Sequence, residues 1–318
     1  MVEIGDLLLA MYGATSGDIA VSKIKGAINQ AILCIRTKQN KKFIESVWNK
    51  HVSKNLRKYL QGGQGNLSAD IVKGISFFFP TLKEQEKIAN LVSLLDERIA
   101  TQNKIIDKLQ SLIRGINDSL YTQHGGEVLT SFANLGTSYS GLSGKSAQDF
   151  GSGKPFITYL NVYSNNVINE NDFQYVAIKD GEKQNVVEYG DILFTLSSET
   201  PEEVGIGSVY LGKEKVYLNS FCFGIHITNT EVAFPPYLSY YVSLTAFRKF
   251  IYPYAQGSTR FNLCKADFEK ASIKLPTLEN QKRIYSVLEH IDCKIETERQ
   301  MLNLYNSQKQ YMLRQMFI

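Results

Sequence analysis

The feature that most constrains this sequence is an internal repeat, because segments of its first third recur near its end. Residues 64–67 (Gln-Gly-Asn-Leu) match residues 260–263 (Arg-Phe-Asn-Leu), and the Pro-Thr-Leu of residues 80–82 recurs at 276–278, both at an offset of 196 residues. The Gly-Asp-Leu-Leu of residues 5–8 has a further match in the Gly-Asp-Ile-Leu of 190–193. Because solenoid repeats are about 20–50 residues long, a period this long indicates two copies of a whole domain.

Each copy ends in a long amphipathic pattern that predicts a helix. Apolar residues recur at heptad spacing in the first copy, and the same offset carries the pattern into the second with one polar exception, Gln308. The positions are Ile88, Leu91, Leu95, Ile105, Leu109, Leu112 and Ile116, followed by Ile284, Val287, Ile291, Met301, Tyr305, Gln308 and Met312. A stripe of roughly 40 residues gives a helix of about 60 Å, too long for an ordinary core helix, which is the alternative.

The two helices are expected to pack on each other, with Thr81 and Thr277 as N-caps. We predict that the seam and partner contacts of this pair include Ile88, Leu95, Leu109, Ile284, Ile291 and Tyr305.

The segment between the helices reads as mixed strands and turns, which makes the fold class α+β. β-rich runs cover residues 186–194 and 216–218, and a helix is expected from Pro235 towards Ile251. The first copy has an equivalent helix from Phe43 to Leu60. The predicted domains are a partial first domain (1–80), a first long helix (81–124), a second domain (125–275) and a second long helix (276–318). The first copy has nothing equivalent to residues 125–186, so we expect its domain to be incomplete.

Composition excludes several classes of protein. The chain has 318 residues, enough for two domains, and 43% hydrophobic residues, as in globular proteins. No apolar run approaches the ~20 residues of a membrane span, and the start has no signal peptide, so we expect a cytoplasmic protein without membrane contact. The four cysteines form no Cys-x-x-Cys pair and indicate neither a disulfide framework nor a zinc site.

The sequence contains no complete catalytic motif. Residues 234–237 (Phe-Pro-Pro-Tyr) resemble the Pro-Pro-Tyr core of amino-methyltransferases, but Phe234 cannot accept the hydrogen bond that the target amino group requires. The Gly-Lys-Ser of residues 144–146 has Tyr139 where a phosphate loop needs glycine. No metal-ligand spacing surrounds the histidines. We therefore expect no catalytic residue, no metal and no cofactor in this chain.

Basic and polar residues suggest contacts with nucleic acid. Eight of the residues between 36 and 58 are lysine or arginine, and among them Lys54 and Arg57 are candidates for phosphate contacts. A solvated helix face explains the same composition equally well. The loop 256–262 carries amide, hydroxyl and guanidinium groups of the kind that read base edges, although a simple turn is the alternative.

These motifs, in this order and present twice, resemble the DNA-specificity (S) subunit of type I restriction–modification enzymes. The residues that carry the resemblance are 144–145, 154–162, 190–193, 256–263 and the helix starts 82–88 and 275–284. The resemblance covers essentially the whole chain. It implies two target-recognition domains joined by an antiparallel pair of long helices, which separate the two halves of a split DNA site.

The resemblance also implies candidate contacts and partners. Candidate DNA contacts in the second domain are Lys145, Lys154, Tyr159, Asn161, Gln256, Ser258, Thr259 and Arg260. Tyr159 is expected to be half-buried, within a strand. The implied partners are double-stranded DNA, methyltransferase (M) subunits that hold S-adenosylmethionine, and restriction (R) subunits, with self-association if another chain supplies the segment that the first domain lacks. The alternative function is a truncated coiled-coil adaptor that assembles with M subunits or with itself, without full sequence-specific DNA binding.

Overall fold

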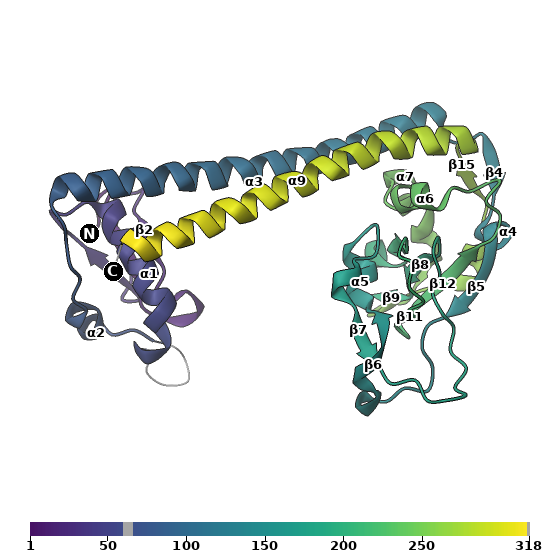
Figure 1. Cartoon of the computed structure of the whole chain (residues 1–318), viewed down its shortest axis with the longest axis horizontal. Helices are drawn as coiled ribbons and strands as arrows, with labels where there is room; N and C mark the ends of the chain where they lie inside the picture. Colours follow the sequence, from purple (N-terminus) through teal and green to yellow (C-terminus); the bar gives the residue numbers. More distant parts are fainter. Residues whose placement is uncertain (60–65, 317–318) are drawn as a thin grey trace. The chain divides into compact units, whose positions relative to one another are not determined.

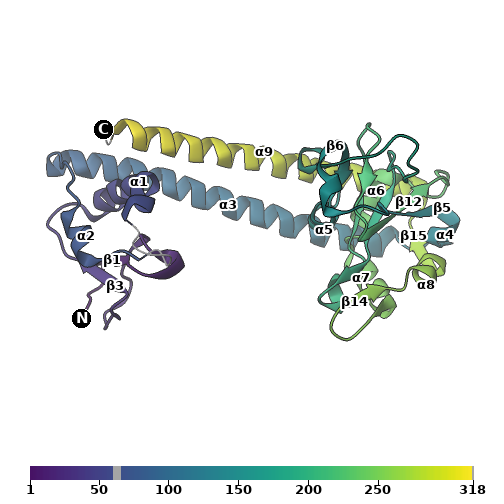
Figure 2. The same ribbon diagram turned by 90° about the horizontal axis from the view of Figure 1, so that it is seen from below.

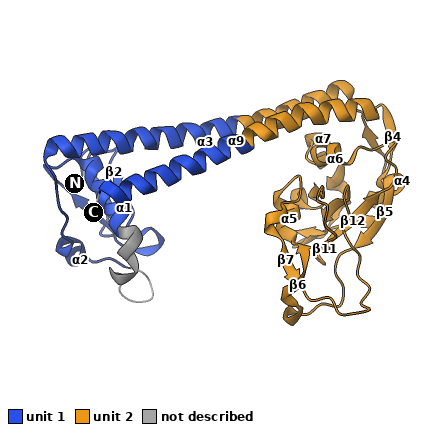
Figure 3. Ribbon diagram, in the orientation of Figure 1, with its two compact units in different colours: residues 1–108, 296–318 blue, residues 109–295 orange. Residues whose placement is uncertain are grey.

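The computed structural model describes residues 1–318 except 60–65 and 317–318, and it does not describe the side chains of residues 52–59 (Figure 1). The chain divides into two compact units (Figure 3). Unit 1 comprises Met1–Lys108 and Glu296–Ile318, and unit 2 comprises Leu109–Ile295. Within the described residues, no helix is long and apolar enough to cross a membrane.

Unit 1 is built on a three-stranded antiparallel sheet of order β2-β1-β3. The strands are β1 (Leu7–Ala10), β2 (Ile19–Val21) and β3 (Ile32–Ile35), and the helices are η1 (Gly13–Thr15), α1 (Lys41–Tyr59) and α2 (Ala69–Gly74). The core of this sheet consists of Leu9, Met11, Trp48 and Leu67. Trp48 is buried and its indole N–H donates to the carbonyl of Gly17 at 2.7 Å, which ties α1 to the turn before β2.

Unit 2 is larger, and its main sheet has four strands in the order β10-β8-β12-β5. The strands of that sheet are β5 (Gly136–Ser140), β8 (Ile192–Thr195), β10 (Gly207–Val209) and β12 (Cys222–Ile227). Smaller sheets comprise β4 (Val128–Thr130) with β15 (Ile273–Leu275), β6 (Phe150–Ile157) with β7 (Gln174–Val176) and β11 (Tyr217–Leu218), and β9 (Ser197–Ser198) with β13 (Ala255–Gln256) and β14 (Phe261–Leu263).

Short helices cover the sheets of unit 2. They are α4 (Phe132–Leu135), η2 (Ala147–Asp149), α5 (Tyr159–Ser164), η3 (Glu170–Asp172), η4 (Pro201–Glu203), α6 (Pro235–Tyr241), α7 (Thr245–Ile251), η5 (Tyr252–Tyr254) and α8 (Lys265–Lys270). Phe132, Phe194, Phe247 and Phe268 pack their rings together in the largest core. The α+β class predicted from the sequence is confirmed.

The two long helices are α3 (Leu82–His124) and α9 (Leu278–Met316), of 43 and 39 residues. At 1.5 Å per residue they are about 64 and 58 Å long. Thr81 caps α3, because its hydroxyl accepts from the amide of Glu84 while the Glu84 carboxylate accepts from the Thr81 amide. Thr277 accepts from the amide of Asn280 in the same way. The helices run antiparallel in unit 1, where Arg98 reaches Tyr305 and Gln102 reaches Glu298.

The seam between the helices differs from the prediction in one of its two columns. The column that contains Leu95, Gln102 and Leu109 is buried or half-buried, as predicted. The other predicted column is wrong, because Ile105 is 37% and Leu112 50% exposed. The column that packs instead lies on the other side, with Gln85, Val92 and Ile106 buried and Ile99 and Ile113 half-buried. The same shift occurs in α9, where Gln281, Leu288 and Ile295 are buried and Val287 and Met301 are exposed.

Equivalent glutamines anchor each long helix to its own unit. The Gln85 side chain donates to the carbonyl of Pro80 and accepts from the amide of Asn40, next to the start of α1. The Gln281 side chain donates to the carbonyl of Pro276 and accepts from the amide of Phe234, next to the start of α6. The internal repeat is therefore a repeat of hydrogen bonds as well as of sequence.

Other predicted elements need correction. The helix expected from Pro235 to Ile251 is interrupted at residues 242–244, where α6 ends and α7 begins. The break is stabilised from α3, since the carboxylate of Asp118 accepts hydrogen bonds from the amide and hydroxyl of Thr245. The β-rich run 186–194 forms a strand only from Ile192, because Gly190 has a φ of +89° in the preceding turn.

Candidate nucleic-acid interface

The β13–β14 hairpin of unit 2 presents four of the predicted DNA contacts on one exposed loop. Gln256, Ser258, Thr259 and Arg260 are all exposed at or beside its tip (β14 is labelled in Figure 2). Gly257 has a φ of +143°, and a Cβ there would lie 2.1 Å from the carbonyl oxygen of Arg260. Only glycine fits this tight turn, which therefore fixes the position of the polar residues that follow.

Arg260 lies on a small platform formed by β9 and the turn before β12. Its guanidinium donates to the Ser197 hydroxyl at 3.2 Å and lies 5.9 Å from the ring centroid of Phe221, which is 56% exposed. A guanidinium over an aromatic face is held by cation–π attraction while its remaining N–H groups stay available. Arg260 is thus positioned to donate outward, as recognition of a phosphate or a guanine edge requires.

Tyr159 borders the same platform. Its hydroxyl donates to the carbonyl of Ser197 at 2.8 Å, and its ring stacks on Tyr163 with centroids 6.0 Å apart. The residue is half-buried, as predicted, but it begins α5 after the N-cap Thr158 and does not alternate within a strand. The structure thus brings Tyr159 and the hairpin residues together.

The remaining candidates of unit 2 lie elsewhere. Asn161 is 3% exposed, and its side chain bonds the backbone of Asn169 through both its nitrogen and its oxygen, which holds a loop in place. Lys145 is engaged with the carbonyl of Ala177 and the carboxylate of Glu182, both at 2.6 Å, and its side chain is 6% exposed. Lys154, in β6, is exposed. Asn161 and Lys145 use their side chains in hydrogen bonds within unit 2. Contact with DNA by any of the three residues stays a prediction.

The two candidates of the first copy, Lys54 and Arg57, lie outside the described residues, because the side chains of this part of α1 are not described. Gln64 and Gly65, which the sequence aligned with Arg260 and Phe261 of the hairpin, also lie outside the described residues.

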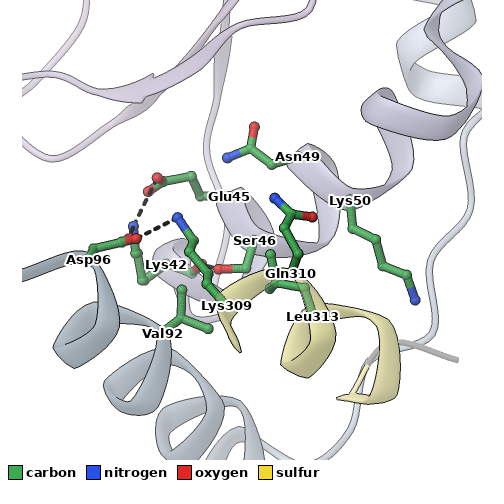
Figure 4. Close-up of a pocket in the computed structure, with 10 residues that line it drawn as sticks. All are labelled: Lys42, Glu45, Ser46, Asn49, Lys50, Val92, Asp96, Lys309, Gln310 and Leu313. Carbon is green, nitrogen blue, oxygen red and sulfur yellow. Dashed lines mark hydrogen bonds and ion pairs between the residues drawn. The ribbon is translucent and has the colours of Figure 1, made fainter. Parts of the chain in front are cut away.

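The sequence did not identify the joint between α1 and the long helices in unit 1. Asp96 of α3 lies between two ammonium groups, Lys42 of α1 at 2.8 Å and Lys309 of α9 at 2.5 Å, and Lys42 also pairs with Glu45 (Figure 4). Burial opposes the ionisation of Asp96, but the bonds from Lys309 and Lys42 outweigh it and hold its pKa below the usual range. In unit 2 the equivalent aspartate, Asp292, accepts a hydrogen bond from Tyr240 of α6. The sequence signal that could have indicated this joint is the recurrence of aspartate at the offset of 196 residues, at Asp96 and Asp292.

Comparison with known proteins agrees with this architecture. Two specificity subunits from Methanocaldococcus jannaschii are similar in sequence. The putative type I restriction enzyme MjaX subunit is 27% identical over 277 residues, which are 77% of this chain and 60% of that protein. The type I restriction enzyme MjaVIII subunit is 27% identical over 128 residues, which are 39% of this chain and 29% of that protein. The chain thus spans three-fifths or less of the length of these relatives.

Solved structures share the fold. A chain from a study of complex assembly and conformational transition in a type I restriction–modification system matches with a TM-score of 0.62 at 17% identity, covering 99% of this chain and 82% of that one. The S subunit of such a system from M. genitalium matches with a TM-score of 0.57 at 13% identity, covering 99% and 83%.

The family match is broad and includes both copies of the repeat. Residues 2–111 and 142–304 match the type I restriction modification DNA specificity domain. These ranges contain both helix starts, the first sheet, and the platform and hairpin around Arg260. The chain therefore belongs to the family of type I restriction–modification DNA specificity subunits.

Proposed function

We propose that this chain is a non-catalytic subunit that reads a bipartite DNA site for a type I restriction–modification system. The observation that carries the proposal is the exposed β13–β14 hairpin with Arg260 held on Phe221 and Ser197. A guanidinium fixed by its neighbours loses little further entropy when it binds a base edge. Unit 2 reads one half of the site through this hairpin, and unit 1 contributes the other half.

The long helices would supply the docking surface for M subunits. In unit 1, Leu91, Leu94, Arg98, Tyr305 and Gln308 line a groove of about 680 Å³, and Leu94 is 61% exposed. Its leucines form an apolar part and Arg98 and Gln308 a polar part, a combination that suits an amphipathic helix of a partner. We propose that a helix of the M subunit occupies it, that the M subunit holds S-adenosylmethionine, and that R subunits join the assembled complex.

The test is methylation of genomic DNA by the chain together with the M subunit from its own system, read by sequencing for modified bases. Methylation at a split motif with two defined halves supports the proposal. Arg260→Ala should lose about 1–3 kcal/mol of discrimination, or roughly 5- to 150-fold, at one position of the half-site read by unit 2. Arg283→Ala, which removes an exposed arginine of α9, is the matched control and should leave the motif unchanged. An unchanged motif with Arg260→Ala would remove this residue from base reading.

A coiled-coil adaptor without full sequence specificity is the second candidate. It is favoured by the smaller sheet of unit 1, which within the described residues has three strands where the main sheet of unit 2 has four. An adaptor would co-purify with M subunits and bind DNA with a steep salt dependence, but without preference among sequences, because counterion release does not depend on sequence.

A further inference from the structure

The outer edge of β3 is the place where the sheets of the two units differ. Their registers align β1 with β8 and β3 with β12, since Leu7 pairs with Ile35 as Ile192 pairs with Ile225. In unit 2 the other edge of β12 is covered by β5 over five residue pairs. Within the described part of unit 1, no strand covers the corresponding edge of β3.

The side chains of β3 are those of an interior strand. Ile32, Leu33, Cys34 and Ile35 are all half-buried, and Leu33 and Ile35 pack against the core around Trp48. Edge strands that stay free in solution usually carry charged residues or proline, which discourage pairing with another chain. Residues 32–35 carry neither, so this edge presents backbone N–H and C=O groups on an apolar strand.

We propose that the outer edge of β3 binds an antiparallel β-strand from outside residues 1–318, in the place that β5 takes on β12. The internal repeat identifies this occupant, because unit 2 contains both the strand and the edge that it covers. Addition of a strand to a sheet edge is an established mode of recognition, in which backbone hydrogen bonds supply affinity and side chains supply specificity.

The residue opposite Cys34 sets the specificity of this edge. In unit 2, Tyr139 of β5 pairs with Gly224, and a Cβ on Gly224 would lie 2.2 Å from the Tyr139 ring. The Tyr139 hydroxyl crosses this glycine and donates to Asp191 at 2.6 Å.

In unit 1, Cys34 stands at the position of Gly224, and its thiol lies 3.5 Å from Asp6, the equivalent of Asp191. A tyrosine placed as Tyr139 is would collide with the Cys34 side chain. The added strand must therefore carry a small residue opposite Cys34, so that β5 of a second copy of this chain is not the expected occupant.

The experiment is amide hydrogen exchange on the full chain, with two synthetic peptides of residues 132–146 as probes, one native and one carrying Tyr139→Ala. We expect the Tyr139→Ala peptide at saturation to slow exchange in residues 32–35 at least about 10-fold, and the native peptide to slow it less than about 2-fold. The other edge strand of the sheet, β2, is the internal control and should not respond. The Cys34→Gly chain should reverse the order, because it restores the glycine over which Tyr139 lies.

Three outcomes would overturn the proposal. In the first, neither peptide slows exchange in β3 of the wild-type chain up to millimolar concentration. In the second, β2 is protected as strongly as β3. In the third, β3 of the chain alone becomes protected as the concentration of the chain rises, and this result would identify a second copy as the occupant. Trp48 fluorescence verifies that the Cys34→Gly chain is folded. The experiment contains no DNA, so its result is independent of the proposed function.

Discussion

Replacing Asp96 by asparagine should destabilise unit 1 selectively. Asparagine keeps the size of the side chain but removes the charge that Lys42 and Lys309 share, and each of these lysine side chains is only 29% exposed. Two ammonium groups would then lie close together at the joint, with Glu45 as the nearest carboxylate on α1. The substitution therefore weakens the attachment of α1 and α9 to α3.

The magnitude follows from the burial of the group. Exposed ion pairs contribute about 0–1 kcal/mol, and breaking a fully buried one costs about 3–5 kcal/mol. The side chain of Asp96 is 30% exposed and bonds two cations, so we expect a loss of about 1–3 kcal/mol. At roughly 4 °C per kcal/mol for a unit of this size, the midpoint of its thermal transition should fall by about 4–12 °C.

The assay is the fluorescence of Trp48 during thermal unfolding. The sequence contains one tryptophan, and it lies buried in the core of unit 1, so its emission reports on this unit alone. Asp107→Asn, at an exposed position on the same helix, is the control, and its midpoint should lie within about 1 °C of the wild-type midpoint. An Asp96→Asn midpoint equal to that of wild type would refute the argument, as would an equal fall in Asp107→Asn.

The pH dependence gives the same argument an independent check. Because the pKa of Asp96 is lower in the folded state than its usual value of 3.8, the stabilisation is present above that value. It is lost as the pH falls through the folded-state pKa. The difference in stability between the wild type and Asp96→Asn should therefore be constant near neutral pH and shrink below about pH 4.

Three further changes test other parts of the fold. Gly224→Ala should cost about 1–3 kcal/mol, measured by chemical denaturation of unit 2, because the new methyl group meets the Tyr139 ring at 2.2 Å. Hydrogen bonds, chiefly from Lys145, lower the pKa of Glu182 from 4.5 to about 2. The contribution of the ionised Glu182 to the stability of the folded state should therefore be lost as the pH falls from 4.5 to about 2, and Glu182→Gln should remove this pH dependence of stability in acid titrations. Gln281→Ala should lower the free energy of unfolding by about 1–3 kcal/mol, because it leaves the Phe234 amide without its acceptor. Hydrogen exchange at the Phe234 amide should become faster, and an unchanged slow exchange would show that the bond is unimportant.

Local patterns in the sequence predicted the long helices and their caps well. The Pro-Thr-Leu starts and the heptad stripe depend only on neighbours along the chain, and both helices begin at the expected residues. The helix interrupted at residues 242–244 could not be anticipated, because the bonds that stabilise the break come from Asp118, more than 120 residues away. Interactions between distant residues override a local pattern wherever they supply hydrogen bonds that the helix itself lacks.

The candidate site was predicted only in part, because some of its features also depend on residues that are distant in the sequence. The hairpin residues are exposed because a glycine turn at Gly257 requires it, and that glycine is visible in the sequence. Ser197 of β9 and Phe221 of the turn before β12, which position Arg260, are distant from it in the sequence and carried no signal of their own. Asn161 and Lys145 have the polar chemistry of a DNA contact, but the partners that bury them lie 8 to 37 residues away. Residue type alone does not distinguish a ligand contact from an internal hydrogen bond.

The error in the helical seam has a physical cause that bears on function. The column through Leu95 and Leu109 has an apolar column on each side, so the sequence alone offers two seams of similar hydrophobicity. Packing within the chain uses the column that contains Val92 and Ile106, and it leaves Ile105 and Leu112 exposed. A helix that is apolar over both flanks has more surface to bury than one partner helix can cover. The flank left exposed is therefore an apolar surface that a further helix could cover, and this is the reason for the proposal that the M subunit docks on the long helices.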